Sequence, residues 1–365
     1  MQGPSSRLTR VPEPGHQGNG GLLDFLLSLQ EECGGSIPFE RFMAEALHHP
    51  RFGYYGSRIA DVGSRGDFST SATVSESLGT AIAAWAIARA AELNWKRIAL
   101  IEIGAGNGRL ARTVLRRLGW FRRLRTDYLI VESSPVLKER QRKLLRRQGV
   151  QWHDSVESAL GALGGQALIF SNELVDAFPC RLFEKQYDGW RELAVTLSHE
   201  GSLAETFGMQ IEENPWFNTF RELPMGQRIE RHESFLRWLA GWAPHLRQGS
   251  VLTIDYGDVA GKLYEGRPAG SLRAYWKHQR LTGRDIYARF GRQDLTADVN
   301  FSDLMEWGES FGWRTASYTT QTDFLREWTS GKRTDGDRFL SSEEGAGTAF
   351  KVLEQTPGKP EISTT

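Results

Sequence analysis

A glycine-rich turn that directly follows a short apolar run is the feature of this sequence with the clearest chemical meaning. The run Ile98–Ile103 leads into Gly104-Ala105-Gly106-Asn107-Gly108, and a helical pattern begins at Leu110. Glycines at such a turn adopt backbone angles that other residues resist, and they let the backbone come close to a ligand. The N–H groups of the first helical turn are free to bind that ligand. The turn therefore predicts a site for a nucleotide-like cofactor.

Three charged residues around this turn narrow the choice of cofactor. Glu132 follows Gly108 by about 24 residues, where nucleotide-binding α/β sheets place the carboxylate that binds ribose hydroxyls. A dinucleotide-binding turn ends in a small residue, but this position is Arg109, which argues against NAD. Glu102 can face a cationic sulfonium or amino group, whereas it would repel a pyrophosphate. The pattern Glu102-x-Gly104-x-Gly106-x-Gly108 resembles the first motif of Rossmann-like methyltransferases, which implies S-adenosylmethionine. A glycine turn that binds no ligand is the alternative.

Polar residues also follow three other predicted strands. Asp154 comes after a short third strand and can accept a hydrogen bond from an adenine amino group; equally, it can cap the helix predicted from Val156. Ser171-Asn172-Glu173 follows the fourth strand, and Asp255-Tyr256-Gly257 follows the fifth. Because open α/β sheets bind ligands outside the carboxyl ends of their strands, we expect these segments to lie around one site.

Short apolar runs alternate with helical patterns through most of the chain. Strands are predicted at residues 98–103, 128–131, 149–152, 167–170 and 251–254, with candidate last strands at 314–318 and 349–353. Helices are predicted at residues 38–47, 74–93, 110–118, 135–147, 156–163, 228–246 and 301–311. This alternation predicts a doubly wound α/β sheet.

Charge and composition weigh against several classes of protein. Lys plus Arg is 45 and Asp plus Glu is 45 in the 365 residues, so no net field attracts nucleic acid or anionic lipid. The arginines between Arg112 and Arg147 lie on amphipathic helices, where we expect a solvated face rather than an RNA surface. No apolar run is long enough to span a bilayer. Cys33 and Cys180 have no metal-ligand spacing. We expect no nucleic-acid partner, no membrane insertion and no metal.

Seven short motifs occur in one order along the chain. They are Arg65-Gly66-Asp67-Phe68-Ser69-Thr70-Ser71, the glycine turn with its strand, Val131-Glu132-Ser133-Ser134-Pro135, Asn172-Glu173-Leu174-Val175-Asp176-Ala177-Phe178-Pro179, Gly189-Trp190-Arg191-Glu192, Ile254-Asp255-Tyr256-Gly257 and Asp294-Leu295-Thr296-Ala297-Asp298-Val299. The ordered set resembles the MidA-like family of methyltransferases, whose mitochondrial members assist the assembly of respiratory complex I. The resemblance covers about residues 38–325.

The resemblance implies a fold, a cofactor and a partner. The implied fold is an α/β, Rossmann-like class I methyltransferase sheet with a helical N-terminal cap and inserted substrate-binding elements. The implied cofactor is S-adenosyl-L-methionine, and the implied substrate is a protein arginine, with complex I subunits among the candidates. The segment between Gly257 and Asp294 matches loosely, so the resemblance defines the substrate less well than the cofactor.

Residue roles follow from the matched motifs and from the strand ends together. The family's Gly-Asp-Phe-x-Thr-Ser loop matches residues 66–71 and is expected beside the cofactor. The expected cofactor-binding residues are Gly66, Asp67, Phe68, Thr70, Glu102, Gly104, Gly106, Gly108, Glu132, Ser133, Asp154 and Asn172.

The expected domain organisation has four segments. Residues 1–21 and 355–365 are predicted to be disordered tails. Residues 22–95 are predicted to form the helical cap and the cofactor-covering loop, and residues 96–354 the methyltransferase domain, with insertions at about 181–246 and 257–300. Asp188-Gly189 predicts a hairpin in the first insertion.

Arginine methylation places a particular demand on the site, because the guanidinium group stays protonated above about pH 12. Carboxylates that hold it through paired hydrogen bonds can orient one nitrogen and stabilise the charge. We expect Glu173 and Asp176 to do this, with Asp255 as a third candidate, because these residues follow the fourth and fifth strands. Local capping of the turn that follows is an equal alternative for Asp176.

Other functions compete with this interpretation. They are a methyltransferase that acts on a small molecule, a non-catalytic assembly factor, and a dehydrogenase, the last weakened by Arg109. Residues 1–21 have no apolar core of a secretory signal, and their prolines argue against an amphipathic transit helix. We therefore expect a cytoplasmic location, with the mitochondrial matrix as the alternative. The sequence does not define the oligomeric state.

Overall fold

The chain folds as two compact units, each assembled from three separate stretches of sequence. The structure is a computed structural model that describes residues 9–10, 20–57, 76–198, 201–211, 214–277, 279–329 and 346–358. The first unit combines Met1–Ala60, Ala177–Phe235 and Ala260–Asp298, and the second combines Asp61–Asp176, Leu236–Val259 and Val299–Thr365.

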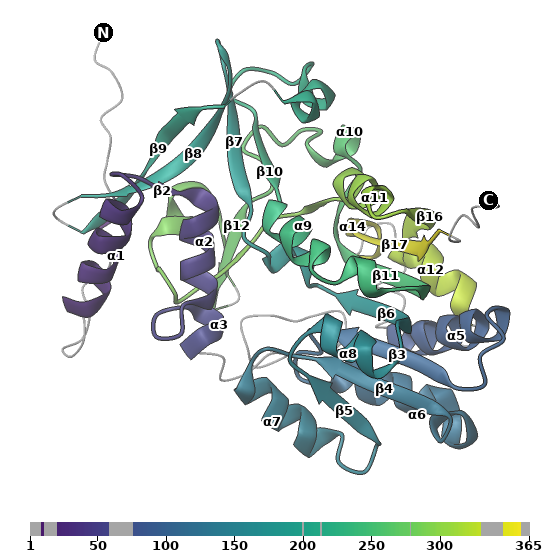
Figure 1. Cartoon of the computed structure of the whole chain (residues 1–365). Helices are drawn as coiled ribbons and strands as arrows, with labels where there is room; N and C mark the ends of the chain where they lie inside the picture. The colour runs from purple at the N-terminus through teal and green to yellow at the C-terminus, as the bar shows by residue number, and fades with distance from the viewer. Residues whose placement is uncertain are drawn as a thin grey trace, which may run out of the picture. The chain divides into compact units, whose positions relative to one another are not determined.

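The second unit is built on one sheet whose strands lie in the order β16-β17-β11-β6-β3-β4-β5 (Figure 1). Their bounds are β3 Ile98–Ile103, β4 Thr126–Val131, β5 Val150–His153, β6 Gln166–Asn172, β11 Gln248–Asp258, β16 Trp313–Thr320 and β17 Phe350–Pro357. Neighbouring strands from β5 to β11 are parallel, whereas β17 runs antiparallel to both β11 and β16. The short strand β15 (Val299–Asn300) pairs in parallel with β11. The doubly wound α/β sheet predicted from the sequence is confirmed.

Helices follow most of these strands. They are α5 Glu76–Glu92, α6 Arg109–Arg123, α7 Pro135–Leu144, α8 Val156–Ala162, α9 Glu233–Ala240, α11 Phe301–Ser310, α12 Gln321–Trp328 and α14 Ala346–Ala349, with short 3-10 turns η1 Val175–Ala177 and η3 Ala243–His245. Trp85 of α5, Phe170 of β6 and Phe350 of β17 are fully buried in one apolar cluster. Parallel strands covered on their faces are apolar along their length, which is why their runs could be located in the sequence. Pro135 begins α7, as the sequence predicts, and Ser134 caps the helix.

The first unit contains mostly antiparallel strands and short helices. One sheet has the order β1-β9-β8-β7-β10, with β2 paired to β8, and a smaller one has the order β13-β12-β14. The strands are β1 Thr9–Arg10, β2 Ile37–Pro38, β7 Arg181–Gln186, β8 Gly189–Leu197, β9 Ser202–Gln210, β10 Arg228–Arg231, β12 Arg273–Trp276, β13 Gln279–Leu281 and β14 Asp294–Thr296. The helices are α1 Gly20–Glu32, α2 Phe39–His48, α3 Tyr54–Ser57 and α10 Ala260–Leu263, with 3-10 turns η2 Pro215–Phe220 and η4 Gly283–Tyr287. The hairpin predicted around Asp188-Gly189 is present as β7 and β8.

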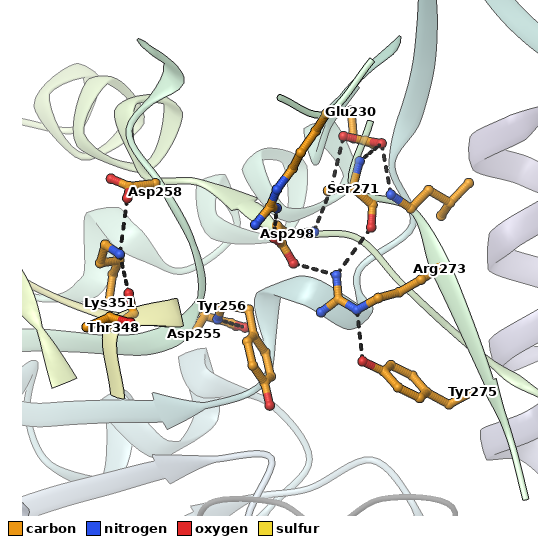
Figure 2. A network of polar contacts seen from close by, with 12 residues as sticks. Glu230, Asp255, Tyr256, Asp258, Ser271, Arg273, Tyr275, Asp298, Thr348 and Lys351 are labelled. Atoms are coloured by element: carbon orange, nitrogen blue, oxygen red, sulfur yellow. Dashed lines mark hydrogen bonds and ion pairs between the residues drawn. The ribbon is translucent and has the colours of Figure 1, made fainter. Parts of the chain in front are cut away.

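The helix predicted over residues 228–246 is wrong in its first part. Residues Arg228–Arg231 form β10, which pairs with β7, and only then do α9 and η3 follow. Cross-strand contacts explain the difference, because Arg228 binds the carboxylates of Glu184 and Glu205 at 2.8 and 2.7 Å. The buried carboxylate of Glu230 accepts hydrogen bonds from the backbone N–H and the hydroxyl of Ser271 at 2.8 and 3.0 Å (Figure 2). Tertiary contacts here override a helical pattern.

Several other features lie beyond what the sequence predicts. The insertion expected at about residues 257–300 contains β12, β13 and β14. Residues 355–357, expected in the C-terminal tail, continue β17, and Gln355 is buried. Among the helices of the described residues, none is long and apolar enough to cross a membrane.

A buried carboxylate ties α5 to β17. Glu354, with 2% of its side chain exposed, accepts hydrogen bonds from Trp85 Nε1 at 3.0 Å and from Arg89 Nε and Nη2, both at 2.8 Å. Arg89 also binds Glu92, whose side chain is 59% exposed. The guanidinium of Arg89 therefore has one buried and one solvated carboxylate partner. Replacing each partner in turn compares the contributions of a buried and an exposed ion pair to stability.

We predict that Glu354→Gln lowers the free energy of unfolding by about 2 kcal/mol or more, because Arg89 loses a charged partner where water cannot replace it. The control Glu92→Gln should cost less than about 0.5 kcal/mol, since exposed ion pairs contribute little. Urea unfolding of both variants measures the difference. Equal losses would contradict the assignment of Glu354 as the structural partner.

Candidate active site

The glycine turn between β3 and α6 has the left-handed backbone that its sequence predicts. Gly104, Gly106 and Gly108 have φ of 67°, 52° and 77°, angles that residues with a Cβ adopt only at a cost. The N–H of Gly104 donates to the carbonyl of Val131 at 2.9 Å, which fixes the turn to the end of β4. A Cβ on Gly104 would lie 3.0 Å from Cδ1 of Leu174. The backbone angle thus favours glycine here, and a Cβ would also make a tight contact with Leu174.

The sheet places this turn at a topological switch point. Strands β4 and β5 lie on one side of β3, and β6 and β11 lie on the other. Loops after β3 and β6 therefore leave the sheet in different directions, and ligands of open α/β sheets bind in the crevice that results. The predicted residues Glu132, Asn172, Glu173 and Asp255 all lie at this carboxyl edge.

Glu132, directly after β4, is a buried carboxylate with partners on both oxygens. Oε1 accepts a hydrogen bond from the N–H of Ser134 at 2.9 Å, and Oε2 accepts one from Nε2 of Gln141 at 3.0 Å. Burial raises its pKa, while the hydrogen bonds from Ser134 and Gln141 oppose that rise. A carboxylate oxygen can accept two hydrogen bonds, so each oxygen keeps capacity for a ribose hydroxyl. The geometry fits a ribose-containing cofactor.

Gln141 is a residue that the sequence analysis did not identify. Its side chain is fully buried, and Nε2 also donates to the carbonyl of Gly106 at 2.9 Å. Its Oε1 accepts a hydrogen bond from Trp152 Nε1 at 3.0 Å. One amide therefore joins the glycine turn to Glu132. A neutral polar residue on the apolar face of α7, four positions after Leu137, is the feature that could have drawn attention to it.

Glu102, the strand-end carboxylate, lies inside the sheet's apolar layer. Its side chain is buried, and Tyr128 donates a hydroxyl hydrogen bond to Oε2 at 2.6 Å. Burial raises the pKa of Glu102 to about 7, the hydrogen bond from Tyr128 opposes this, and the charge of Glu132 adds to it. In the structure, Glu102 is therefore hydrogen-bonded to the phenol group of Tyr128. That Glu102 faces a cationic ligand stays a prediction.

The first residue after β6, Glu173, has a strained backbone conformation. Glu173 has a φ of 52°, which a residue with a side chain adopts only where its surroundings impose it. Its N–H donates to the carbonyl of Ile254 at 2.9 Å. Asn172 Nδ2 donates to Oε1 of Glu173 at 3.0 Å, and Oδ1 of Asn172 is buried with no hydrogen-bond partner in the described part of the chain. Strain and an unused buried acceptor mark this turn as a place for a ligand.

Asp255, in β11 one residue beyond the last pairing of β11 with β6, holds this turn in place. Its Oδ2 accepts hydrogen bonds from the N–H groups of Leu174, Val175 and Asp176 at 3.1, 2.8 and 3.4 Å. Oδ1 accepts one from the N–H of Tyr256 at 2.9 Å (Figure 2). Asp255 is completely buried, and burial together with the charge of Asp176 raises its pKa well above the ordinary range. These contacts use Asp255 to fix backbone rather than to meet a ligand.

Two other predicted residues, Asp154 and Ser133, are exposed. Asp154 does not cap α8, because Ser155 does so by accepting a hydrogen bond from the N–H of Ser158 at 3.1 Å. The helix-cap alternative for Asp154 is therefore wrong. Its exposed side chain forms an ion pair with Lys138, and Ser133 is exposed too. Gly66, Asp67, Phe68 and Thr70 lie outside the described residues.

The fold and the site together define a class of protein. The sheet is parallel except for one antiparallel strand, a left-handed glycine turn follows its first strand, and a buried carboxylate follows its second. These features together are typical of an S-adenosylmethionine-dependent methyltransferase. A family model described as "Putative S-adenosyl-L-methionine-dependent methyltransferase" matches residues 81–319. The chain belongs to this family. Its cofactor is S-adenosyl-L-methionine, as the sequence predicts.

Curated relatives and a solved structure agree with this assignment. The mitochondrial protein arginine methyltransferase NDUFAF7 homolog of Caenorhabditis elegans is 28% identical over 74% of this chain and 68% of its own length. The human mitochondrial protein arginine methyltransferase NDUFAF7 is 26% identical over 74% of this chain and 65% of its own length. A crystal structure from Burkholderia thailandensis bound to S-adenosyl-homocysteine has 26% identity and a TM-score of 0.82, and the match covers 95% of each chain.

These comparisons confirm the MidA-like resemblance, while the roles of single residues remain predictions. The curated relatives are named as mitochondrial proteins, so they do not support the cytoplasmic location predicted for this chain.

We predict that Gly104→Ala weakens S-adenosylhomocysteine binding at least about tenfold, because it combines a left-handed backbone with a Cβ close to Leu174. Gly164→Ala is the control, since Gly164 has a φ of +65° but nothing within 4 Å of its Cβ position. Both variants carry similar backbone strain, so titration calorimetry isolates the effect at the site. Equal affinity for the two variants would show that the turn does not approach the cofactor.

We predict a stability difference between the wild type and Glu102→Gln that depends on pH. The folded protein holds a proton on Glu102 up to about pH 7, whereas the unfolded chain releases it near the ordinary value of 4.5. The contribution of Glu102 is therefore fully present below pH 4.5 and is lost as the pH rises through 7, by on the order of 3 kcal/mol. Denaturant unfolding from pH 4.5 to 8 measures it. Parallel curves for both proteins would contradict the raised pKa.

Proposed function

We propose that this methyltransferase modifies an arginine of a partner protein. The names of the curated relatives support arginine as the acceptor. The structural observation that carries this proposal is the left-handed backbone of Glu173, which holds its carboxylate at the switch point. When bound, S-adenosylmethionine supplies an activated methyl group. The chain's own residues then have to hold the guanidinium so that one nitrogen is aligned and water is kept away.

Glu173 is suited to that task by its hydrogen bonds. Asn172 donates to Oε1, and the N–H of Glu173 is fixed to β11, so the carboxylate has little freedom to turn away from the edge. A guanidinium presents two parallel N–H groups that match a carboxylate. An arginine whose charge is neutralised on one side directs its remaining nitrogen to the methyl donor. Glu173 therefore binds and orients the acceptor in this proposal.

Asp176 and Asp255 take different parts in the same proposal. Asp176 is a second carboxylate for the guanidinium, on the turn that begins with Glu173. Asp255 is a positioning residue, because its oxygens are occupied by backbone N–H groups from Leu174 to Asp176 and by that of Tyr256. Replacing Asp255 would disturb the turn rather than remove a substrate contact.

The names of the same relatives also support a proposal for the compartment. Their names place them in mitochondria, and on that basis we propose the alternative expectation, the mitochondrial matrix, for this chain. The partner would then be a mitochondrial protein, and a subunit of respiratory complex I is the candidate that the MidA-like resemblance offers.

We predict that Glu173→Gln lowers kcat for protein methylation about 100-fold or more, because the guanidinium loses its charged, aligned partner. The affinity for S-adenosylhomocysteine should change less than about twofold, since the variant keeps the shape of the side chain. Steady-state methylation of extract protein and titration calorimetry provide the two measurements. Unchanged turnover would remove Glu173 from the mechanism.

Two controls make this test specific. Glu139→Gln on α7 removes an exposed carboxylate that contacts only Lys143 among the described residues, and it should behave as the wild type. Incubation of the wild type with labelled cofactor and extract should place label in protein, and hydrolysis should release methylarginine. Label in small molecules instead would favour the small-molecule alternative, and label in neither would favour the non-catalytic one.

A further inference from the structure

An exposed apolar turn follows the break in α6, on the second unit. Gly119 has φ 76° and ψ 162°, which interrupts the helix, and residues 120–125 project beyond it. Trp120, Phe121 and Leu124 are 62%, 78% and 58% exposed. The rings of Trp120 and Phe121 lie edge to face with centroids 4.7 Å apart. Trp120 and Leu124 are four residues apart and so share one face of the turn.

Arginines surround this apolar turn, and the acidic residue next to it in sequence, Asp127, forms an ion pair with Arg97. From Arg109 to Arg125 there is no Asp or Glu, and Arg122, Arg123 and Arg125 belong to the turn itself. Arg123 Nη1 donates to Oε1 of Gln148 at 3.0 Å, which brings the exposed arginines 146 and 147 close to it. Within the described ranges, none of these five arginines forms an ion pair. Arg122, Arg125, Arg146 and Arg147 are exposed, so their guanidinium groups can bind an anionic surface.

Ordinary structural roles account for only part of this arrangement. Arginines near the C-terminus of a helix interact favourably with its dipole, so some of them are explained by α6 itself. That effect gives no reason for two aromatic rings and a leucine in water beside them. Solvated helix faces, which the sequence predicts for these arginines, are normally polar.

We propose that residues 120–125, with Arg146 and Arg147, form a docking surface for an anionic phospholipid bilayer. Tryptophan and phenylalanine settle at the level of lipid headgroups, and arginines beside them bind lipid phosphates while their stems stay in contact with apolar surface. The chain as a whole has no net charge, but screening limits electrostatic attraction to about 10 Å, so the local group decides. No helix needs to span the membrane.

The position of the turn leaves the active site free. α6 begins at the glycine turn and runs back to the start of β4, so residues 120–125 lie at the sheet edge opposite the cofactor-binding edge. A bilayer held there would not cover the carboxyl ends of the strands. The membrane contact concerns placement of the enzyme and does not rest on the identity of the methyl acceptor.

Vesicle cosedimentation of the full chain tests the proposal. Wild type should bind vesicles with about 30 mol% phosphatidylglycerol and not vesicles of phosphatidylcholine alone, and about 0.5 M salt should release most of it. Arg122→Gln with Arg125→Gln should lower partitioning about fivefold for each arginine, and Trp120→Ser with Phe121→Ser about tenfold or more. Unchanged cofactor affinity shows that each variant is folded.

Tyr187→Ser is the matched control, because Tyr187 is a 98% exposed aromatic residue on the first unit and should not affect vesicle binding. Equal sedimentation of the wild type with neutral and anionic vesicles would overturn the proposal, as would unaffected binding of the two double variants. Self-association in the absence of lipid, lost in Trp120→Ser with Phe121→Ser, would assign the surface to a second copy of the chain instead. Binding to polyglutamate but not to vesicles would assign it to an acidic protein.

Discussion

The divergence of β3 and β6 is the constraint on which the site of this protein depends. After β3 the chain adds β4 and β5 on one side of the sheet, and after β6 it adds β11 on the other side. The loops that follow the parallel strands β3 and β6 therefore turn away from each other. The chain fills that place with glycines in left-handed conformations on one side and with Glu173, also left-handed, on the other. Both conformations are costly for residues with side chains, and the sheet imposes them through the hydrogen bonds of Gly104 and Glu173 to β4 and β11.

The hydrogen bonds that each buried carboxylate of the site already accepts separate binding groups from supporting groups. Asp255 receives four backbone N–H groups and has little capacity left, whereas Glu132 receives one hydrogen bond on each oxygen and keeps room for a ligand. The side-chain amide of Gln141 makes hydrogen bonds inside the protein to Gly106, Glu132 and Trp152. It therefore sets the distance between the glycine turn and Glu132 without having to meet the cofactor. Carboxylates of similar burial thus have different functions.

Sequence reasoning located what depends on periodicity and missed what depends on tertiary contact. The central strands β3, β4 and β6 contain short continuous apolar runs, because both of their faces are covered, and β3 was placed to the residue. β10 was mistaken for a helix, because its Arg228 and Glu230 find their partners on β7, on β9 and at Ser271, which no local pattern contains. Gln141 was missed for the same reason, since its partners come from β3's turn, β4's end and β5. Asp154 and Ser155 are adjacent, and both residue types cap helices, so only the folded structure shows that Ser155 caps α8.

The two edges of the sheet impose different chemical requirements on the chain. The carboxyl edge holds acidic groups in dry surroundings, and this burial raises the pKa of Glu102 and Glu132. The opposite edge, reached after the 15 residues of α6 or roughly 20 Å, presents arginines and exposed rings. If these rings served only the fold, they would be buried. A surface that keeps them in water at the edge away from the chemistry is consistent with a role in where the enzyme sits rather than in what it does.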